Sequence, residues 1–112
     1  ELLSTIPGVA KPAEPRFGRT NWQSYCVRLT TAVEQRATMQ SLLAAGVSTR
    51  RGIMCSHREH AYAQTPLRHP LPHSELAQDQ CILLPLYSEM TDDSVDLVAR
   101  LLEECVCATA RS

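Results

Sequence analysis

The segment of residues 46–62 gathers the side chains of this sequence that are best suited to bind an anion. Three arginines and two histidines lie between Arg50 and His60, whereas basic residues elsewhere are scattered. The planar guanidinium groups of Arg50 and Arg51 suit phosphate or carboxylate, and the imidazole of His57 can donate, accept or titrate near neutral pH. These residue types predict a loop that holds an anionic small molecule. The alternative is a solvated connection whose charges only keep it hydrated.

Two histidine pairs raise a metal site as an alternative chemistry for the same region. The sequences H-R-E-H and H-P-L-P-H put four imidazoles within 17 residues, with Cys55 close by (His57, His60, His69 and His73). Two prolines stiffen the second pair, and neither spacing resembles an established zinc pattern. We therefore predict no metal ligands in this chain.

The five cysteines favour reduced thiols over a disulfide framework. Their number is odd, no C-x-x-C is present, and Cys26 and Cys81 stand in apolar runs, as small core residues do. This usage is typical of a cytoplasmic protein. A nucleophilic site that pairs Cys55 with His57 or His60 is an alternative. Nothing in the sequence, however, activates the thiol or supplies a third group to orient the imidazole.

Length and composition bound the function classes. The chain has 112 residues, of which 44% are hydrophobic and 21% charged, and its net charge is −1. These values fit one globular domain with a modest core. So weak a net charge produces no electrostatic field that would favour general binding to nucleic acids or membrane surfaces. No apolar run approaches the roughly 20 residues of a membrane span. We therefore expect neither nucleic acid nor membrane as a partner.

Lysine usage excludes one kind of catalysis. The chain has one lysine, Lys11, which stands beside Pro12 in a proline-rich segment. Chemistry that needs a lysine Schiff base in a preformed pocket is therefore not expected from these residues alone. Because the sequence begins at Glu1 and not at a methionine, we expect it to be a piece of a longer protein.

The elements before the charged segment follow from alternation and capping patterns. Alternating apolar residues with aromatic and β-branched content predict a strand over residues 21–29. Thr31 is followed three positions later by Glu34, the capping-box pattern of a helix that runs to about Ala45. A short strand over residues 47–49 then leads into the charged loop.

The second half of the chain predicts a loop, a short helix, a strand and a long helix. Residues 63–73 carry three prolines and are typical of a loop, and a short helix follows over residues 74–80. Residues 81–87 form an apolar run typical of a buried strand, although Pro85 removes one ladder bond or ends the strand early. Thr91 caps the last helix. Its apolar residues recur at spacings of three, four and four (Val95, Val98, Leu102 and Val106).

These elements predict an α+β fold: a small two-layer domain with a sheet of about three strands and helices packed on one face. Residues 1–20 have the proline and glycine content of an extended lead-in, and residues 21–112 form the domain. The other face of so small a sheet needs cover. We therefore expect a partner surface beyond this chain.

Four blocks in this order resemble the C-terminal small domain of the DegT/StrS-type sugar aminotransferases. N-W-Q-S-Y-C-V-R-L (21–29) resembles the family's strand after the interdomain linker, and L-L-A-A-G-V-S-T (42–49) is similar to its helix ending in a G-[IV]-x-T turn. H-R-E-H-A-Y (57–62) resembles its H-x-x-x-x-Y segment. I-L-L-P-L-Y-S-E-M-T-D-D-S-V (82–95) is similar to its L-P-L-Y-x-x-[ML]-T-[DE] signature and the helix that follows. The last block is the most specific.

The resemblance implies a part in pyridoxal-phosphate chemistry that this chain does not perform alone. In that family the large N-terminal domain binds the cofactor and supplies the Schiff-base lysine, and an amino group passes, usually from glutamate, to a keto sugar carried on a nucleotide. The small domain helps to close the site, and the enzymes are typically dimers. The resemblance transfers His57 and Tyr62 as residues near the sugar nucleotide and assigns no catalytic residue to this chain.

The sequence also departs from the family pattern. Arg50, Arg51 and Gly52 stand where many members have an aromatic residue or histidine. We infer that the two arginines serve a more anionic substrate or the diphosphate of a nucleotide. The expected function is thus that of a sugar aminotransferase domain that shapes the substrate site and dimer contacts. The alternative is a stand-alone binding or self-association module without enzymatic activity.

Overall fold

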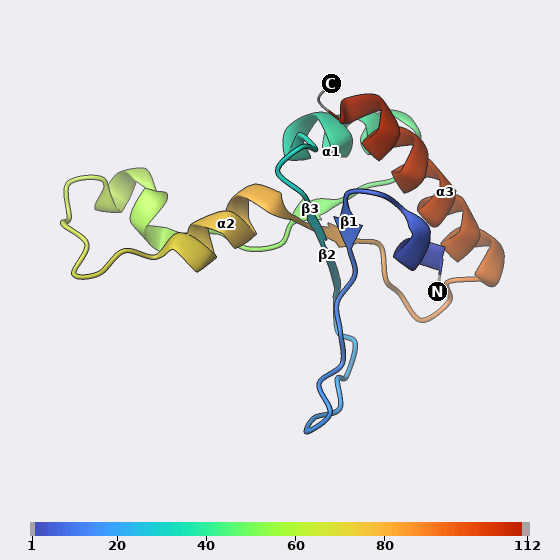
Figure 1. Ribbon diagram of the computed structural model, residues 1–112, viewed down its shortest axis with the longest axis horizontal. Coiled ribbons are helices and arrows are strands. Elements are labelled where there is room, and N and C mark those ends of the chain that lie inside the picture. The colour runs from blue at the N-terminus through green and yellow to red at the C-terminus, as the bar shows by residue number, and fades with distance from the viewer. Residues whose placement is uncertain (1, 111–112) are drawn as a thin grey trace.

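The computed structural model describes residues 2–110, and Figure 1 shows their arrangement. In chain order the elements are a 3-10 turn (η1, Leu2–Thr5), strand β1 (Val9–Ala10), strand β2 (Tyr25–Leu29), helix α1 (Gln35–Ala44), strand β3 (Arg50–Arg51), two 3-10 turns (η2, Ser56–Arg58, and η3, His60–Tyr62), helix α2 (Pro72–Gln80), strand β4 (Cys81–Leu84) and helix α3 (Asp92–Thr109). The predicted α+β architecture is confirmed.

The sheet has four strands in the order β1-β2-β4-β3, and every neighbouring pair is antiparallel. The sequence predicts three strands; the fourth, β1, lies in the segment expected to be an irregular lead-in. In the central pair Val27 lies opposite Ile82, and both side chains are fully buried. Because successive strand residues point to opposite faces, this register also places Leu29 and Leu84 on the core face.

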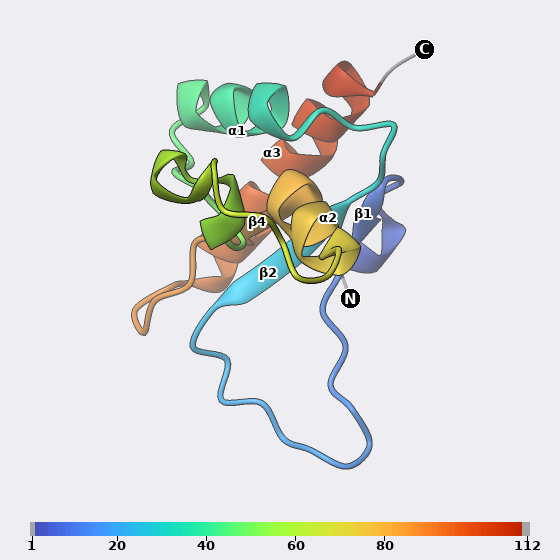
Figure 2. The ribbon, with the colours of Figure 1, turned by 90° about the vertical axis from the view of Figure 1, so that its left-hand side faces the viewer.

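Helices α1 and α3 cover the core face of the sheet, as the sequence predicts. Leu42 of α1 and Leu102 of α3 are fully buried against the strands. The hydroxyl oxygens of Thr38 and Thr109 form a hydrogen bond of 2.8 Å that joins the two helices. Helix α2 and the segment before it lie on the other side of the sheet (Figure 2).

Helix α1 begins later than the capping box predicts. Its N-cap is Glu34, whose carboxylate accepts hydrogen bonds from the backbone N–H groups of Arg36 at 3.2 Å and Ala37 at 2.6 Å. These bonds satisfy two of the free N–H groups that every helix start carries. The prediction of Thr31 as the cap is wrong because the chain up to Val33 is held elsewhere, in an isolated β-bridge to Ala110.

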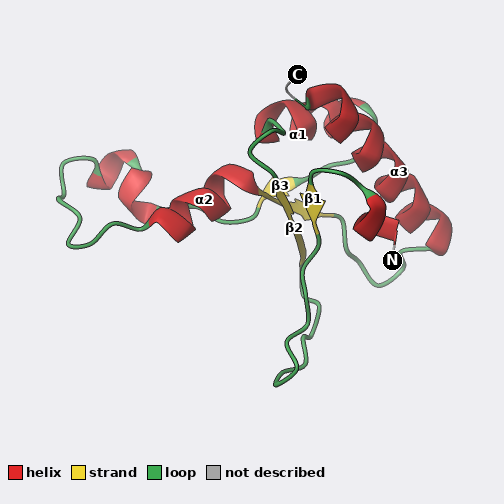
Figure 3. Ribbon diagram, in the orientation of Figure 1, coloured by secondary structure: helices red, strands yellow, loops and turns green. Residues whose placement is uncertain are grey.

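The first residues are packed and not extended, which corrects the expected lead-in. Ile6 is 5% exposed and belongs to the core, and β1 pairs Val9 with Leu29. The backbone N–H of Thr30 donates to the carbonyl of Gly8 at 2.9 Å. The irregular segment is confined to residues 11–24, which project away from the core as a long loop (Figure 3).

The strand predicted over residues 47–49 lies later, at β3. Gly46 adopts the predicted left-handed conformation, with a φ of 88°, and the N–H of Val47 then donates to Leu42 O at 2.8 Å, which closes the end of α1. The chain is therefore still turning where the sequence predicts a strand. Strand β4 ends at Leu84, so Pro85 ends the strand early.

Candidate functional site

The arm, defined as residues 53–80, leaves the sheet after β3 and returns to it through α2 (Figure 1). Its base is fixed at Cys55, which is 4% exposed. The backbone N–H of Cys55 donates to Gln78 Oε1 at 2.9 Å, and the thiol donates to Ser74 O at 3.2 Å. These bonds hold η2 against α2 and bring His57 within reach of that helix.

His57 lies between η2 and α2, where a carboxylate binds its imidazole. Nε2 is 2.9 Å from Glu75 Oε1, and the side chain is 14% exposed. A carboxylate accepts hydrogen bonds and does not donate them, so Nε2 carries the proton and Nδ1 is left for another partner. The ring is thereby oriented by the protein while one nitrogen stays available.

Arg58 ties the carboxylates of α2 to the same turn. Its Nη1 is 2.6 Å from Asp79 Oδ1, and its Nη2 is 3.6 Å from Glu75 Oε2. Glu75 and Asp79 are four residues apart and therefore share one face of α2. The hydrogen bond from Arg58 holds the pKa of Asp79 below its usual range. We refer to His57, Arg58, Glu75 and Asp79 as the arm network.

The α2 members of this site are not singled out by the sequence analysis. A signal for Glu75 and Asp79 is present, because two carboxylates at this helical spacing face one way and a basic pair stands at residues 57–58. Gln78 carries no such signal, since the partner of its amide depends on how the arm folds back. It is 8% exposed and polar, and only the structure shows what it binds.

Arg50 and Arg51 occupy the edge strand β3 and not a loop. Arg50 lies opposite Leu83, and Arg51 lies opposite Ile82. Because Ile82 faces the core, Arg51 lies on the α1 side of the sheet and Arg50 on the side of the arm. Both are exposed. The structure thus divides the predicted cluster: Arg50 shares a face with the arm, whereas Arg51 lies beside α1.

Tyr62 lies in the same arm, and the residue is 53% exposed. Its backbone N–H donates to Glu59 O at 2.9 Å, and within residues 2–110 its hydroxyl forms no hydrogen bond. The alternative pairing of Cys55 with His57 is not formed, since each side chain is bonded to α2 instead. Among the described residues no group of three or more His, Cys, Asp or Glu side chains is placed to hold a metal ion.

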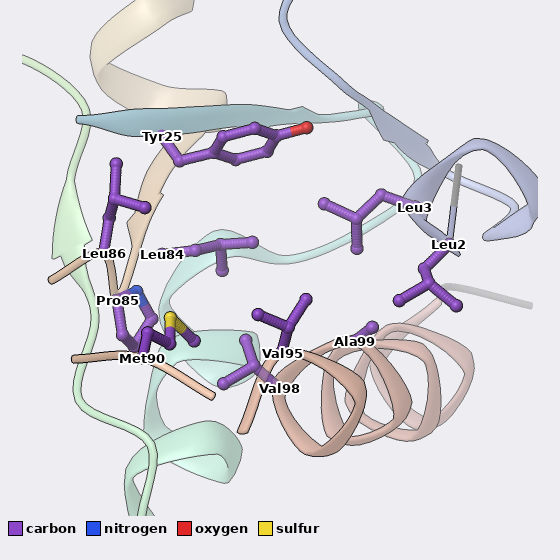
Figure 4. Close-up of a pocket in the computed structure, with 10 residues that line it drawn as sticks. All are labelled: Leu2, Leu3, Tyr25, Leu84, Pro85, Leu86, Met90, Val95, Val98 and Ala99. Carbon is purple, nitrogen blue, oxygen red and sulfur yellow. The ribbon is translucent and has the colours of Figure 1, made fainter. Parts of the chain in front are cut away.

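An apolar groove of about 300 Å³ lies between η1, the end of β4 and α3 (Figure 4). Figure 4 shows Leu3, Leu84 and Val98 pointing into it, with the ring of Tyr25 along one side. Leu2 and Val95 at its mouth are 50% and 41% exposed. A groove lined so heavily by apolar side chains is typical of a contact surface.

Residues 1–103 match the profile of the DegT/DnrJ/EryC1/StrS aminotransferase family. The chain belongs to this family. The resemblance carried by the four sequence blocks is therefore confirmed, and it extends over the packed residues before β2 as well.

Solved sugar aminotransferases share the fold. TlmJ, an aminotransferase from Streptoalloteichus hindustanus, is 27% identical, with a TM-score of 0.81 over 96% of this chain and 28% of its own. DesI, solved in the presence of its TDP-sugar product, is 31% identical, with a TM-score of 0.85 over 94% of this chain and 28% of its own. PseC of Helicobacter pylori, an aminotransferase involved in the biosynthesis of pseudoaminic acid, has the same fold at 15% identity, with a TM-score of 0.84 over 96% of this chain and 29% of its own.

This chain spans about 28% of the length of TlmJ and DesI. Family members are generally pyridoxal-phosphate enzymes, but residues 2–110 do not fit that cofactor by themselves. The one lysine, Lys11, is exposed at the start of the projecting segment 11–24. No helix among the described residues is both long and apolar enough to cross a membrane.

Proposed function

We propose that this chain is the C-terminal small domain of a pyridoxal-phosphate aminotransferase that acts on nucleotide-linked keto sugars, with glutamate as amino donor. It shapes the substrate site and contributes to homodimer contacts, and it does not catalyse transamination alone. The cofactor is held by the remaining part of the parent protein. Family membership supports the aminotransferase chemistry, and the TDP-sugar product of DesI, the 31% identical relative, supports the substrate class.

The observation that carries the proposal is the orientation of His57. A carboxylate that binds one ring nitrogen fixes the tautomer of an imidazole. Here the carboxylate of Glu75 accepts a hydrogen bond from Nε2 of His57 at 2.9 Å. Arg58 forms ion pairs with both Glu75 and Asp79 and so holds these carboxylates in place. The same arrangement orients imidazoles in metal and catalytic sites, where a carboxylate binds one ring nitrogen and the other nitrogen binds the ligand. We assign Nδ1 of His57 to the sugar nucleotide.

Arg50 and Tyr62 complete the proposed substrate-facing set. Both are exposed and lie on or beside the arm. The guanidinium of Arg50 suits the diphosphate of the nucleotide, and the ring of Tyr62 offers an apolar face with a hydroxyl at its end. Arg51, which the sequence analysis groups with them, lies on the opposite face of the sheet.

The proposal is tested in the full-length parent enzyme by His57→Ala, with His60→Ala as the matched control. His60 is exposed and lies three residues further along the arm. We expect His57→Ala to lower kcat/KM for the nucleotide sugar by about tenfold or more, as the loss of a hydrogen bond to a substrate does. His60→Ala should change it by less than about twofold. If His57→Ala instead lowers the free energy of unfolding and leaves the kinetics intact, His57 is structural and the assignment is wrong.

A further inference from the structure

Arg51 and Arg36 line a surface pocket that the proposed function does not use. The pocket has a volume of about 410 Å³ and lies between α1 and the segment that leads into β3. Ser48 and Thr49 also line it, together with Met39 of α1. The sequence alone does not predict this pocket, because only the fold brings α1 and β3 together.

Both arginines line this pocket, and Arg51 also acts on the carboxylate of Asp79, whose pKa is lowered mainly by the hydrogen bond from Arg58 and further by Arg51. No Asp or Glu is among its lining residues, and within the described part of the chain neither arginine forms an ion pair. Arg36 stands in the first turn of α1, where the helix dipole is already positive and a cation is unfavourable. The carboxylate of Glu34, which caps the helix, offsets part of this positive charge. An anion in the pocket would relieve this repulsion.

A neighbouring pocket of about 390 Å³ shares both arginines and is less suited to an anion. It is lined by the carboxylates of Glu34 and Asp79, and the second of these is already paired with Arg58. The first pocket has no carboxylate among its lining residues and is therefore the better candidate for an anion.

Thr49 supplies an independent observation. Its Oγ1 is buried, and among residues 2–110 it has no hydrogen-bond partner. Leaving a buried hydroxyl unsatisfied costs about 1–3 kcal/mol, so such groups are few in folded proteins and each needs an explanation. Thr49 lines the same pocket as the two arginines, although its Oγ1 has almost no accessible surface. A ligand with acceptor oxygens would satisfy this hydroxyl once the side chain turns toward the pocket.

We propose that this pocket binds the phosphate group of a small phosphorylated molecule. Two guanidinium groups and a hydroxyl are all donors, and they match the several acceptor oxygens and the charge of a phosphate better than the two oxygens of a carboxylate. The pocket exceeds a phosphate in size, and the side chains of Met39 and Leu43 receive the organic part of the ligand.

The test is a titration of the 112-residue chain, labelled with nitrogen-15, with inorganic phosphate, glycerol phosphate and succinate at constant ionic strength. We expect both phosphates to shift the amide signals of residues 36–51 in a saturable way, and succinate to bind at least about tenfold more weakly. Arg51→Gln and Arg36→Gln should each weaken phosphate binding by about tenfold, the value of one charge-assisted hydrogen bond. Thr49→Val should weaken it severalfold.

Arg28→Gln is the matched control, because Arg28 is exposed on the opposite face of the sheet. It should leave phosphate affinity unchanged within about twofold. Equal losses in Arg28→Gln and Arg51→Gln would show general surface charge and overturn the proposal. Phosphate-induced shifts that do not saturate would also overturn it, and so would succinate binding as tightly as phosphate. Shifts confined to the arm would assign the phosphate to the substrate face and not to this pocket.

Discussion

Single residues in this protein acquire their roles from strand register. Arg50 and Arg51 are adjacent and of one type, so the sequence predicts one anion-binding pair. In the structure they lie on β3, and adjacent strand residues point to opposite faces. Arg50 therefore shares a face with the arm, and Arg51 lines the pocket beside α1. The sequence identifies both side chains as groups that can bind an anion. Only the pairing of β3 with β4 shows on which face of the sheet each of them lies.

Thr49 leads to a prediction at the residue scale. Because its buried Oγ1 has no partner among the described residues, Thr49→Val removes an unsatisfied hydroxyl and keeps the side-chain shape. We expect the free energy of unfolding in phosphate-free buffer to rise by about 1 kcal/mol, measured by urea denaturation. Ser48→Ala, at an exposed neighbouring residue, should change it by less than about 0.5 kcal/mol. A clear loss of stability in Thr49→Val would mean that the hydroxyl is satisfied in solution.

At the scale of elements, the sequence pattern predicts the periodic segments well but predicts their first and last residues poorly. The apolar stripe of α3 places Val98, Leu102 and Val106 in the core, as predicted, whereas Val95 at its start is 41% exposed beside the apolar groove. The start of α1 was missed because a β-bridge between Val33 and Ala110, residues far apart in the sequence, holds the chain before the helix. Such long-range pairings leave no local pattern.

The arm network gives a prediction of pH dependence. The hydrogen bond from Arg58 lowers the pKa of Asp79 in the folded protein. The pair therefore stabilises the fold above the unfolded-state pKa of Asp79, and this contribution is lost as pH falls through the lower, folded-state pKa. We expect Asp79→Asn to reduce stability at pH 7 and to have no effect at about pH 2.

The measurement for this prediction is urea denaturation of both proteins at each pH. Because the pair is exposed, the difference at pH 7 should be small and should shrink with added salt. Glu103→Gln serves as the control, since Glu103 is exposed on α3 and forms no ion pair within residues 2–110. A stability difference between Asp79→Asn and the original protein that persists at about pH 2 would contradict the assignment of the effect to this ion pair.

At the scale of the whole molecule, several large apolar side chains have no cover among the described residues. Phe17 is 95% exposed and Met54 is 76% exposed, and the apolar groove opens beside α3. The small size of the sheet predicts an uncovered surface. It does not locate that surface, because the groove depends on how η1 packs against α3. These positions fit a domain that packs against the rest of a larger aminotransferase.

The most direct test of the central claim is an activity assay on the full-length parent protein. The protein is incubated with pyridoxal phosphate, L-glutamate and a TDP-linked keto sugar, and the products are identified by mass spectrometry. We predict that 2-oxoglutarate and a TDP-amino sugar form in equal amounts, and that the amino sugar is absent when glutamate is left out. The absence of both products across TDP-, UDP- and GDP-linked keto sugars, from a protein shown to have bound the cofactor, would contradict the account.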